Sequence, residues 1–544
     1  MKPPNVRMSL RGLSIVAVGF TVLTIVFTHP QTLYLTSHVS GHFDSLFSVW
    51  RLAWVAHQIT SDPFHLFDAN IFFPERMTLA YSDAMLLPGV VLAPLAWLGV
   101  SPVAIYNFAV LASFVLSATA AAALGWRLTG RIEAGIVAGV IFGFAPHRFD
   151  HFSHLELLLN WWMPLAFVAL QDALKTGRPR AYAALAAWLS LQVLSCIYHG
   201  LFLTVCIGAA AVTAIATGQA TSLRRHVPGV AWLGVAAVVC LLYSLPYQAN
   251  RQVVGERPLE EIALYSARPS DFIATPPENV LYGSVMSHFG KAERFLFPGV
   301  LAAALAVTGL FSRRRRAIAV WVVTLWIATE LSLGINGLIY PVLYNNVEVF
   351  HGLRAPARAG ILILLSVAAL AALGVEVILG RFRARAQQLV VIGAIVSGMG
   401  VEYFSRVQLV PLEPTPAIYK ILEHEQHSVI LELPVARPEA LAPMPEALYM
   451  YYSTTHWKSL LNGYSGFYPK NYVLTLETLR NFPDEASLTF LETEGVTHLV
   501  LHRDFWFGDL DYDETVDALR DHSVPLVVRT VRTTIFSLPR KAAN

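Results

Sequence analysis

The run AGILILLSVAALAALGVEVIL, residues 359–379, decides the class of fold. A helix of about 20 predominantly apolar residues is long enough to cross the hydrocarbon core of a bilayer, which is about 30 Å thick. The rest of the chain has the same character, because 55% of its 544 residues are hydrophobic and only 14% are charged. Ordinary soluble domains carry about 25% charged residues. We therefore predict a polytopic α-helical membrane protein.

Similar apolar runs bring the expected number of transmembrane helices to about eleven. The other ten lie at 12–28, 103–125, 132–145, 161–174, 181–198, 201–217, 228–246, 295–311, 317–333 and 389–404. The run 85–100 contains Pro88 and Pro94 and would reach only about 24 Å as a helix. We expect it to be re-entrant or interfacial.

Basic residues set the expected orientation. Lys2, Arg7 and Arg11 precede the first run. Further basic residues gather in alternate short loops, namely Arg127, Arg131, Lys175, Arg178, Arg180, Arg224, Arg225, Arg313, Arg314, Arg315, Arg316, Arg381, Arg383 and Arg385. Cytoplasmic loops carry an excess of Lys and Arg. We therefore predict a cytoplasmic N-terminus, a transmembrane domain over 1–404 with a long first outer loop at 29–102, and an extracytoplasmic domain over 405–544.

The composition of 405–544 predicts a small α/β domain. SVILELPV (428–435) is typical of a buried strand, and DEASLTFLETEGVTHLVLH (484–502) of a capped helix, a glycine stop and a second strand. Two more strands are expected at 525–529 and 533–538. The segment 449–469 is rich in aromatic residues, which suits either sugar binding or packing against the transmembrane domain.

The first outer loop begins with GHFDSLFSVWRLAW (41–54), which has the periodicity of an amphipathic helix. Its aromatic face consists of Phe43, Phe47, Trp50 and Trp54. Aromatic rings on such a helix favour the headgroup region of a membrane, so we expect this face to lie there.

Asp44 is the candidate catalytic residue of this loop. A carboxylate at the membrane surface is suited to deprotonate an acceptor hydroxyl while a lipid carrier stays in the bilayer. The alternative is that Asp44 caps a helix beginning at Ser45. Arg51, on the same polar face, and Asp83, which directly precedes the run 85–100, are candidate substrate-binding residues, and Asp83 is equally a candidate helix cap.

The second outer loop contains His147, His151 and His154 at helical spacing. Histidines at i and i+4 on one helix face can hold a metal ion, here with Asp150 or Glu156 as a further ligand. The alternative is that these groups line a hydrated cavity or that the histidines lie at the membrane interface. Arg148, His154 and Glu156 are also candidates for substrate binding, with Arg148 and His154 as partners for a phosphate.

The segment LRAPAR (353–358) places Arg354 and Arg358 on the outer side, against the positive-inside bias. Arginine binds phosphate through bidentate, charge-assisted hydrogen bonds, so both residues are candidate substrate-binding groups. The alternative is that their side chains reach to the lipid headgroups.

Several functions are disfavoured by what the sequence lacks. A net charge of +2 gives no basis for nucleic-acid binding. The chain has no Walker motif, no glycine-rich phosphate loop and no G-x-S-x-G elbow, so any energy must come with the substrate. We expect no cofactor, with a metal ion as the less favoured alternative.

The order of these features resembles the C-type glycosyltransferase fold, in particular its bacterial branch that depends on polyprenyl-phosphate sugars. The stretches GHFDSLFSVWRLAW, DANIFFP, LRAPAR and HWKSLLNGYSGF are similar to a group of large bacterial membrane proteins related to that fold. Asp44 matches the family's carboxylate in the first outer loop, although no second acid adjoins it here.

The resemblance implies inverting transfer of one sugar from a polyprenyl-phosphate carrier to an unknown acceptor at the outer face of the bacterial inner membrane. In that scheme Asp44 is the base, Arg354 or Arg358 compensates the leaving phosphate, and Arg148 or His154 orients the donor. The alternative is a non-catalytic protein of the same architecture that binds a lipid-linked glycan or a partner in envelope assembly.

Overall fold

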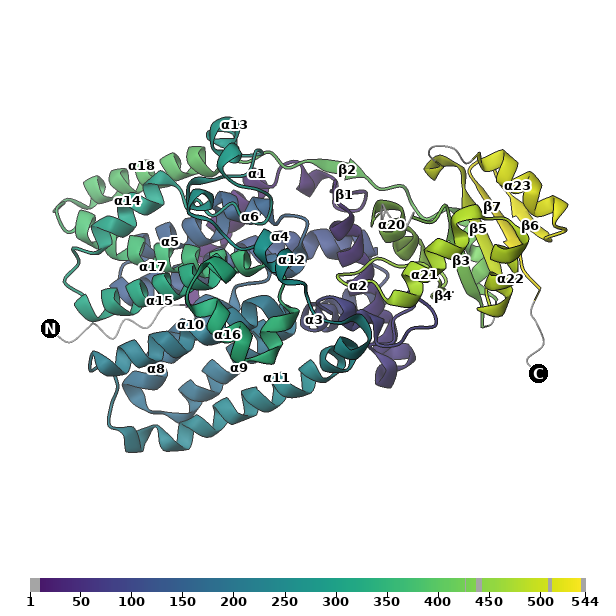
Figure 1. The fold of residues 1–544 in the computed structure, drawn as a ribbon. Helices are drawn as coiled ribbons and strands as arrows, with labels where there is room; N and C mark the ends of the chain where they lie inside the picture. Colours follow the sequence, from purple (N-terminus) through teal and green to yellow (C-terminus); the bar gives the residue numbers. More distant parts are fainter. Residues whose placement is uncertain (1–9, 426, 437–442, 507–510, 540–544) are drawn as a thin grey trace. The chain divides into compact units, whose positions relative to one another are not determined.

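The computed structural model describes residues 10–425, 427–436, 443–506 and 511–539, so Lys2 and Arg7 lie outside the described residues. The chain forms two compact units, traced in sequence colours in Figure 1. The helical unit comprises 1–35, 107–244 and 256–409, and the sheet unit comprises 36–106, 245–255 and 410–544. The first long loop therefore shares a unit with the C-terminal residues.

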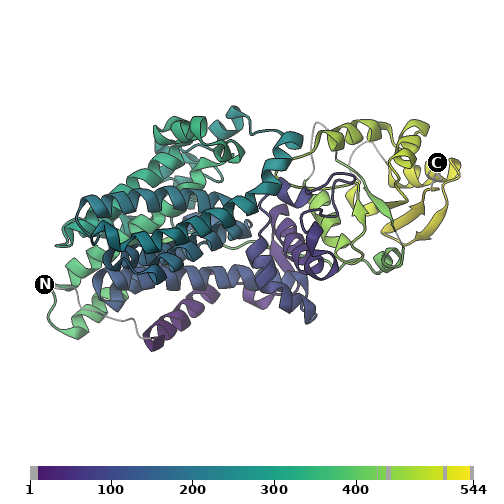
Figure 2. The same cartoon turned by 90° about the horizontal axis from the view of Figure 1, so that it is seen from below.

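Every expected transmembrane run contains a helix. These helices are α1 (Leu10–Phe27), α4 (Pro102–Thr129), α5 (Ile132–Phe144), α8 (Trp162–Thr176), α9 (Pro179–Ser195), α10 (Ile197–Ala216), α11 (Val227–Val254), α14 (Val300–Gly309), α15 (Arg315–Leu333), α17 (Gly360–Leu379) and α18 (Arg385–Tyr403). Figure 2 shows long helices of this unit from below. Among the described residues, seven helical segments are long and apolar enough to cross a membrane.

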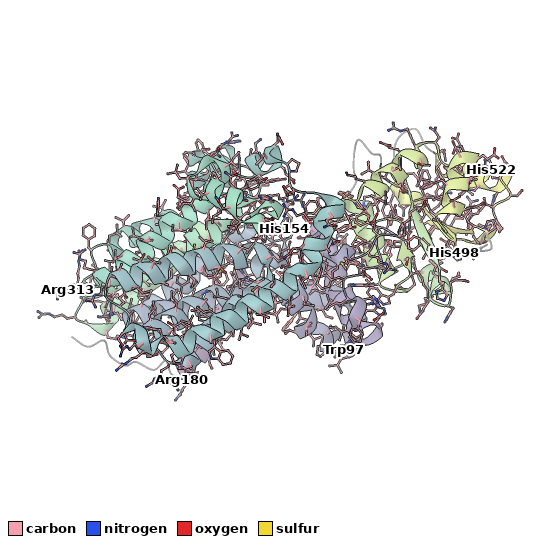
Figure 3. The ribbon with its side chains drawn as sticks, turned by 60° about the horizontal axis from the view of Figure 1, so that its bottom comes forward. Trp97, His154, Arg180, Arg313, His498 and His522 are labelled. Atoms are coloured by element: carbon pink, nitrogen blue, oxygen red, sulfur yellow. The ribbon has the colours of Figure 1, made fainter. Side chains whose placement is uncertain are left out.

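The basic loops and the candidate site lie apart within the helical unit. Figure 3 shows Arg180 and Arg313 toward one end of the helices and His154 nearer the other. This is the separation expected if the basic loops face the cytoplasm.

Helix α14 is shorter than the run 295–311 from which a span was predicted. Gly299 has φ 98°, so the helix begins only after it, at Val300. The carboxylate of Glu402, on α18, accepts hydrogen bonds from the N–H groups of Val300 and Leu301. These first N–H groups have no partner inside the helix, so the carboxylate stabilises the N-terminus of α14.

Helix α17 is buried along almost its whole length and packs against α5, α14 and α15. It meets α14 at two glycines. A Cβ added at Gly374 would lie 2.0 Å from the carbonyl oxygen of Leu305, and one added at Gly309 would lie 2.0 Å from that of Leu370. Small residues of this kind let two helix backbones approach closely in a membrane protein.

Within the described residues, the main sheet of the sheet unit has five strands in the order β4-β3-β5-β7-β6. They are β3 (Val429–Leu433), β4 (Ser459–Leu460), β5 (His498–His502), β6 (Leu526–Arg529) and β7 (Thr533–Ser537). Strand β3 pairs in parallel with β4 and β5, whereas β7 pairs antiparallel with β5 and β6. Helix α22 (Glu485–Thr493) is capped by Asp484, which accepts from the N–H of Ser487 at 2.9 Å. The predicted strands and capped helix are confirmed.

The two faces of this sheet bury different partners. Alternate residues of a strand point to opposite faces. Leu431 and Leu499 contribute to a core that includes residues of α22 and α23 (Tyr512–Asp521). Ile430 and Val500 contribute to a second core, which contains aromatic residues of the first loop. The first loop and the C-terminal strands therefore share one hydrophobic core.

This core corrects the prediction that the aromatic face of residues 43–54 lies among lipid headgroups. These residues lie on α2 (Phe43–Ser61), and Phe47, Trp50 and Trp54 are at most 4% exposed. The aromatic segment 449–469 supplies their partners, since Tyr464 lies 5.2 Å from Phe47 and Trp457 lies 5.8 Å from Trp54, between ring centroids. Segment 449–469 thus packs against the first loop.

The run 85–100 forms α3 (Leu86–Trp97), a helix of 12 residues. At 1.5 Å per residue its length is about 18 Å, which is short of the roughly 30 Å needed to cross. Val91 and Trp97 on its surface are exposed. Helix α3 is therefore too short to span the bilayer.

We predict that Gly374→Ala lowers the thermal unfolding midpoint of the protein in detergent. The added Cβ meets the backbone of α14, and overpacking of this kind costs about 1–3 kcal/mol. The control is Gly393→Ala on α18, where nothing lies within 4 Å of the added atom. There the better helix propensity of alanine should leave the midpoint unchanged or raise it. Equal midpoints for the two variants would contradict the proposed close packing.

A second prediction concerns Glu446 on α20 (Pro443–Ser453). Burial raises the pKa of this carboxyl to about 8. The groups of Tyr472 and Asn462 lie near enough to offset part of that rise in pKa, but neither carboxyl oxygen has a hydrogen bond of good geometry. The folded protein therefore holds a proton that the unfolded chain, with a pKa of about 4.3, has already released.

The stability due to this proton is full below about pH 4.3 and is lost as the pH rises to about 8, by up to about 1.4 kcal/mol per pH unit. Glu446→Gln cannot titrate, so its unfolding midpoint should fall less between pH 5 and pH 8 than that of the wild type. Glu477→Gln, at an exposed position, is the control and should follow the wild type. Parallel curves for all three proteins would refute the assignment.

Candidate active site

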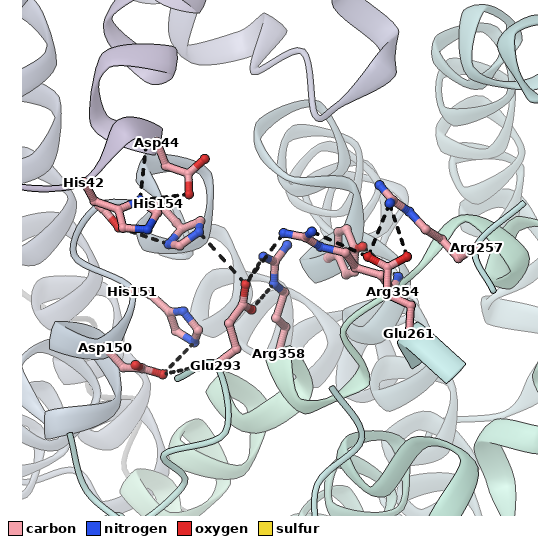
Figure 4. Close-up of polar contacts among 12 residues, drawn as sticks. His42, Asp44, Asp150, His151, His154, Arg257, Glu261, Glu293, Arg354 and Arg358 are labelled. Atoms are coloured by element: carbon pink, nitrogen blue, oxygen red, sulfur yellow. Dashed lines mark hydrogen bonds and ion pairs between the residues drawn. The ribbon is translucent and has the colours of Figure 1, made fainter. Parts of the chain in front are cut away.

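Glu293 is the centre of the charged cluster in the helical unit, drawn in Figure 4. It precedes α14 and forms a bidentate pair with Arg358, at 2.6 Å from Nε to Oε2 and 2.5 Å from Nη2 to Oε1. Its own N–H donates to Oδ2 of Asp150 at 2.9 Å. Three segments that are far apart in the sequence therefore meet at one residue.

Arg354 extends this cluster toward solvent. Its Nη2 lies 4.0 Å from Oε1 of Glu293, and its Nη1 lies 3.6 Å from Oε1 of Glu261. Its side chain is 29% exposed, whereas that of Arg358 is only 6% exposed. Tyr198, on α10, accepts a hydrogen bond from the N–H of Arg354 at 2.9 Å, and its ring lies under the guanidinium of Arg358 at 4.8 Å. Both arginines thus contact Tyr198, but Arg354 is more accessible to solvent than Arg358.

The charge state of Glu293 follows from its partners. Burial by itself would raise the pKa of Glu293, but the charge and hydrogen bonds of Arg358 outweigh it. The pKa of Glu293 consequently lies well below its ordinary value. Glu293 is a carboxylate at any physiological pH and balances the charge of Arg358.

The three histidines of the second outer loop do not lie on one continuous helix, which corrects the predicted helical face. Helix α6 (Pro146–Asp150) ends before His151, and α7 (Leu155–Leu158) begins after His154. His147 donates from Nδ1 to the carbonyl of Phe295 at 2.9 Å. Burial lowers the pKa of His151 well below its ordinary value, so this ring is neutral. In the described part of the chain, no three His, Cys, Asp or Glu side chains could hold a metal ion.

His154 and Glu156 follow Asp150 closely in the sequence, but their contacts differ. Nε2 of His154 lies 4.0 Å from Oε1 of Glu293, so His154 is a member of the cluster. Glu156 is buried in the first turn of α7.

Arg148 points into the helical unit and is only 1% exposed. Its guanidinium donates to Oδ1 of Asn160 at 2.7 Å and to the carbonyl of Leu158 at 3.3 Å. It also lies over the ring of Phe114 at 4.6 Å. These contacts link α6 to the segment 158–160, so a structural role accounts for Arg148.

Asp44 lies in the sheet unit, and the structure corrects the prediction that it could cap α2. The N-cap is His42, and α2 begins at Phe43, so Asp44 is inside the first turn. Oδ1 of Asp44 accepts from the hydroxyl of Tyr464 at 2.8 Å, and Oδ2 lies 3.1 Å from Nδ1 of His42. The carboxylate is 14% exposed. Two groups thus fix its orientation while part of it faces solvent.

Arg51 and Asp83 lie next to each other in the same unit. Arg51 is 1% exposed and donates to the main-chain oxygen of Asp83 at 2.7 Å and to Oγ of Ser48 at 2.9 Å. Oδ1 of Asp83 accepts from the N–H of Met85 at 3.3 Å, just before α3. The Arg51 side chain therefore connects α2 to the segment just before α3. The N-cap of α3 is Met85, so the prediction that Asp83 caps this helix is wrong.

Glu293, Glu261 and Tyr198 are members of the site that the sequence did not predict. Two arginines on the disfavoured side imply nearby carboxylates, and this is the signal that could have led to Glu293. However, the loop 248–294 also contains Glu256, Glu260 and Glu278. The sequence alone does not distinguish among these acids.

No protein-family profile and no curated protein sequence matches the chain. Among solved structures it is similar to the arabinofuranosyltransferase AftD from Mycobacteria, with a TM-score of 0.66, 13% identity, and coverage of 98% of this chain and 40% of AftD. The chain thus spans less than half the length of AftD.

Weaker likenesses are found to two further structures. The oligosaccharyltransferase AglB from Archaeoglobus fulgidus gives a TM-score of 0.45, 12% identity, and coverage of 91% of this chain and 69% of AglB. ArnT from Cupriavidus metallidurans gives a TM-score of 0.36, 13% identity, and coverage of 97% of this chain and 98% of ArnT. These two likenesses are too weak to carry an argument. The apolar helices and the likeness to AftD identify the chain as a multi-pass membrane protein with the C-type glycosyltransferase fold.

Proposed function

We propose that this chain is a membrane glycosyltransferase that moves one sugar from a polyprenyl-phosphate carrier to an acceptor on the outer face of the bacterial inner membrane. The observation that carries the proposal is Arg354, a partly exposed guanidinium in a chain with the C-type fold. Its carboxylate neighbours lie at 3.6 Å and 4.0 Å, which is too long for hydrogen bonds. Its N–H groups therefore retain the capacity to bind a phosphate.

The two arginines have different parts in this proposal. Arg358 uses Nε and Nη2 on Glu293 and is nearly inaccessible, so it supports the cluster. Tyr198 fixes the main chain of Arg354 through a hydrogen bond, and the Arg354 side chain is 29% exposed, so its guanidinium is accessible to the phosphate of a donor. His154, beside Glu293, is a second group that could orient the phosphate.

Asp44 is the proposed base. In the reaction the acceptor oxygen attacks the anomeric carbon, the bond from that carbon to the phosphate oxygen breaks, and Asp44 takes the acceptor's proton. The configuration of the sugar is inverted, and the polyprenyl phosphate leaves with the electron pair. Arg354 stabilises the negative charge that develops on this phosphate. Support for Asp44 comes from its fixed orientation between His42 and Tyr464.

We predict that Asp44→Asn lowers transfer by about 10²–10⁴-fold, the usual contribution of a general base. Asparagine keeps an oxygen for the hydroxyl of Tyr464, so the unfolding midpoint should not change. The measurement is release of free polyprenyl phosphate when purified protein is incubated with a polyprenyl-phosphate sugar. The control is Asp62→Asn, which removes an exposed carboxylate from the end of the same helix.

Normal turnover by Asp44→Asn would rule out Asp44 as the base. If the wild type binds the polyprenyl-phosphate sugar but releases no polyprenyl phosphate, the chain is instead a binding protein for lipid-linked glycans.

A second prediction separates the arginines. Arg354→Ala should lower kcat/KM for the polyprenyl-phosphate sugar by about 100-fold, which is comparable to the loss of one hydrogen-bond donor to a developing charge. Its unfolding midpoint should not change. Arg358→Ala leaves Glu293 as an unpaired buried charge, which costs about 3–5 kcal/mol, so it should lower the midpoint strongly. If Arg354→Ala also lowers the unfolding midpoint strongly, Arg354 has a structural role and does not mark the phosphate site.

A further inference from the structure

The sheet unit contains a cavity of about 300 Å³ that the proposed reaction does not use. We call it the Trp457 cavity. Its walls include three aromatic side chains and three charged ones, namely Trp54, Phe73, Trp457, Asp68, Glu75 and Arg76. Its volume is at the lower end of the range for small-molecule sites, about 300–1,000 Å³. The cavity is therefore large enough for a small ligand.

The aromatic wall is rigid. Trp54 donates from Nε1 to the carbonyl of Leu66 at 2.9 Å, which fixes its ring. Trp457 stacks on His57 with 4.3 Å between the ring centroids and an interplanar angle of 12°. Burial lowers the pKa of His57, which favours the neutral ring in this stack. Trp457 is only half-buried, so part of its ring is available at the cavity wall.

Trp457 also has a strained backbone, with φ 56°. A bulky residue in the left-handed region is an outlier, and strain of this kind collects at ligand sites. The surrounding structure holds the strained residue in place, because the side chains of His57 and Trp54 pack on its indole.

The polar wall offers hydrogen-bond acceptors. Oδ1 of Asp68 accepts from the N–H of Met77 at 2.8 Å, and Oε1 of Glu75 accepts from Nδ2 of Asn471 at 2.8 Å. An ionised carboxylate has about four acceptor positions, so each group is oriented by the protein and still has capacity for a ligand. Arg76 also lines the cavity and supplies donors.

The mixture of charges selects the kind of ligand. Two carboxylates disfavour an anion, and Arg76 disfavours a cation. A hydroxyl group is both a donor and an acceptor, so it suits carboxylates and a guanidinium together. A pyranose or furanose ring carries several hydroxyls and an apolar C–H face that can lie on an indole ring. A neutral saccharide matches both walls.

We propose that the Trp457 cavity binds one or two sugar units of a longer neutral saccharide. As a consequence that rests on the proposed function, the bound saccharide is part of a glycan acceptor. The acceptor class would then be a neutral glycan rather than a protein or a charged lipid headgroup.

The test uses the full-length protein purified in detergent, with maltotriose, mannotriose and arabinotriose as probes. Calorimetry and saturation-transfer NMR measure binding, and tetramethylammonium and inorganic phosphate serve as charged competitors. We expect at least one trisaccharide to bind saturably, and neither ion to displace it.

Trp457→Ala should weaken that binding by about tenfold or more, equivalent to 1.4 kcal/mol. Asp68→Asn provides a second variant with a milder change, because asparagine keeps an oxygen for the N–H of Met77 while it loses the charge, and it should also weaken binding. Trp232→Ala is the matched control, since Trp232 is exposed on α11 in the helical unit.

Absence of saturable binding by all three trisaccharides would overturn the inference, as would binding that both cavity variants leave unchanged or displacement by either ion. The saccharide-binding results can be distinguished from the results of the transfer assay. Asp44→Asn should bind the saccharide normally while it loses transfer. A wild type that releases polyprenyl phosphate but binds no saccharide would refute only the cavity, and one that binds saccharide without transfer would refute only the reaction.

Discussion

The buried pair between Glu293 and Arg358 is the interaction on which the site in the helical unit depends. Taking two charges out of water is expensive, and the cost is recovered only when the geometry is good and the remaining hydrogen-bonding groups are satisfied. Both conditions hold, because the pair is bidentate and neither side chain has a buried polar atom without a hydrogen-bond partner. The same pair limits where Arg354 can lie, since only three residues separate Arg354 from Arg358.

The packing of α17 makes this geometry possible. Arg358 directly precedes α17, and α17 is fixed along its length by close contact with α14 at Gly309 and Gly374. The start of the helix is equally crowded, since a Cβ at Gly360 would lie 2.4 Å from the side chain of Leu296. A buried ion pair needs rigid supports of this kind, because a small displacement would leave a charge without its partner. Apolar helix packing thus determines a polar site at the helix end.

The sequence predicted what depends on local pattern. Apolar length located every helix of the expected spans, and alternation with cap and glycine signals located the strands β3, β5, β6 and β7 and the helix α22. It failed where a contact joins distant segments. The aromatic face of α2 has the composition of an interfacial helix, but Tyr464 and Trp457, some 400 residues later, cover it. Likewise the partner of Arg358 lies in a loop with several acids, and only the fold selects Glu293.

The shared core of the sheet unit has a consequence for Asp44. The carboxylate of Asp44 accepts a hydrogen bond from the hydroxyl of Tyr464. Asp44 lies on α2, and the same helix buries Trp50 in a core built partly from β3 and β5. Asn70 of the first loop accepts from the indole of Trp50 at 3.2 Å and donates to the carbonyl of Lys458 at 3.0 Å. The first loop thus cannot bury its aromatic face without the C-terminal residues. The C-terminal domain is therefore a structural requirement for the geometry of Asp44, whatever else it binds.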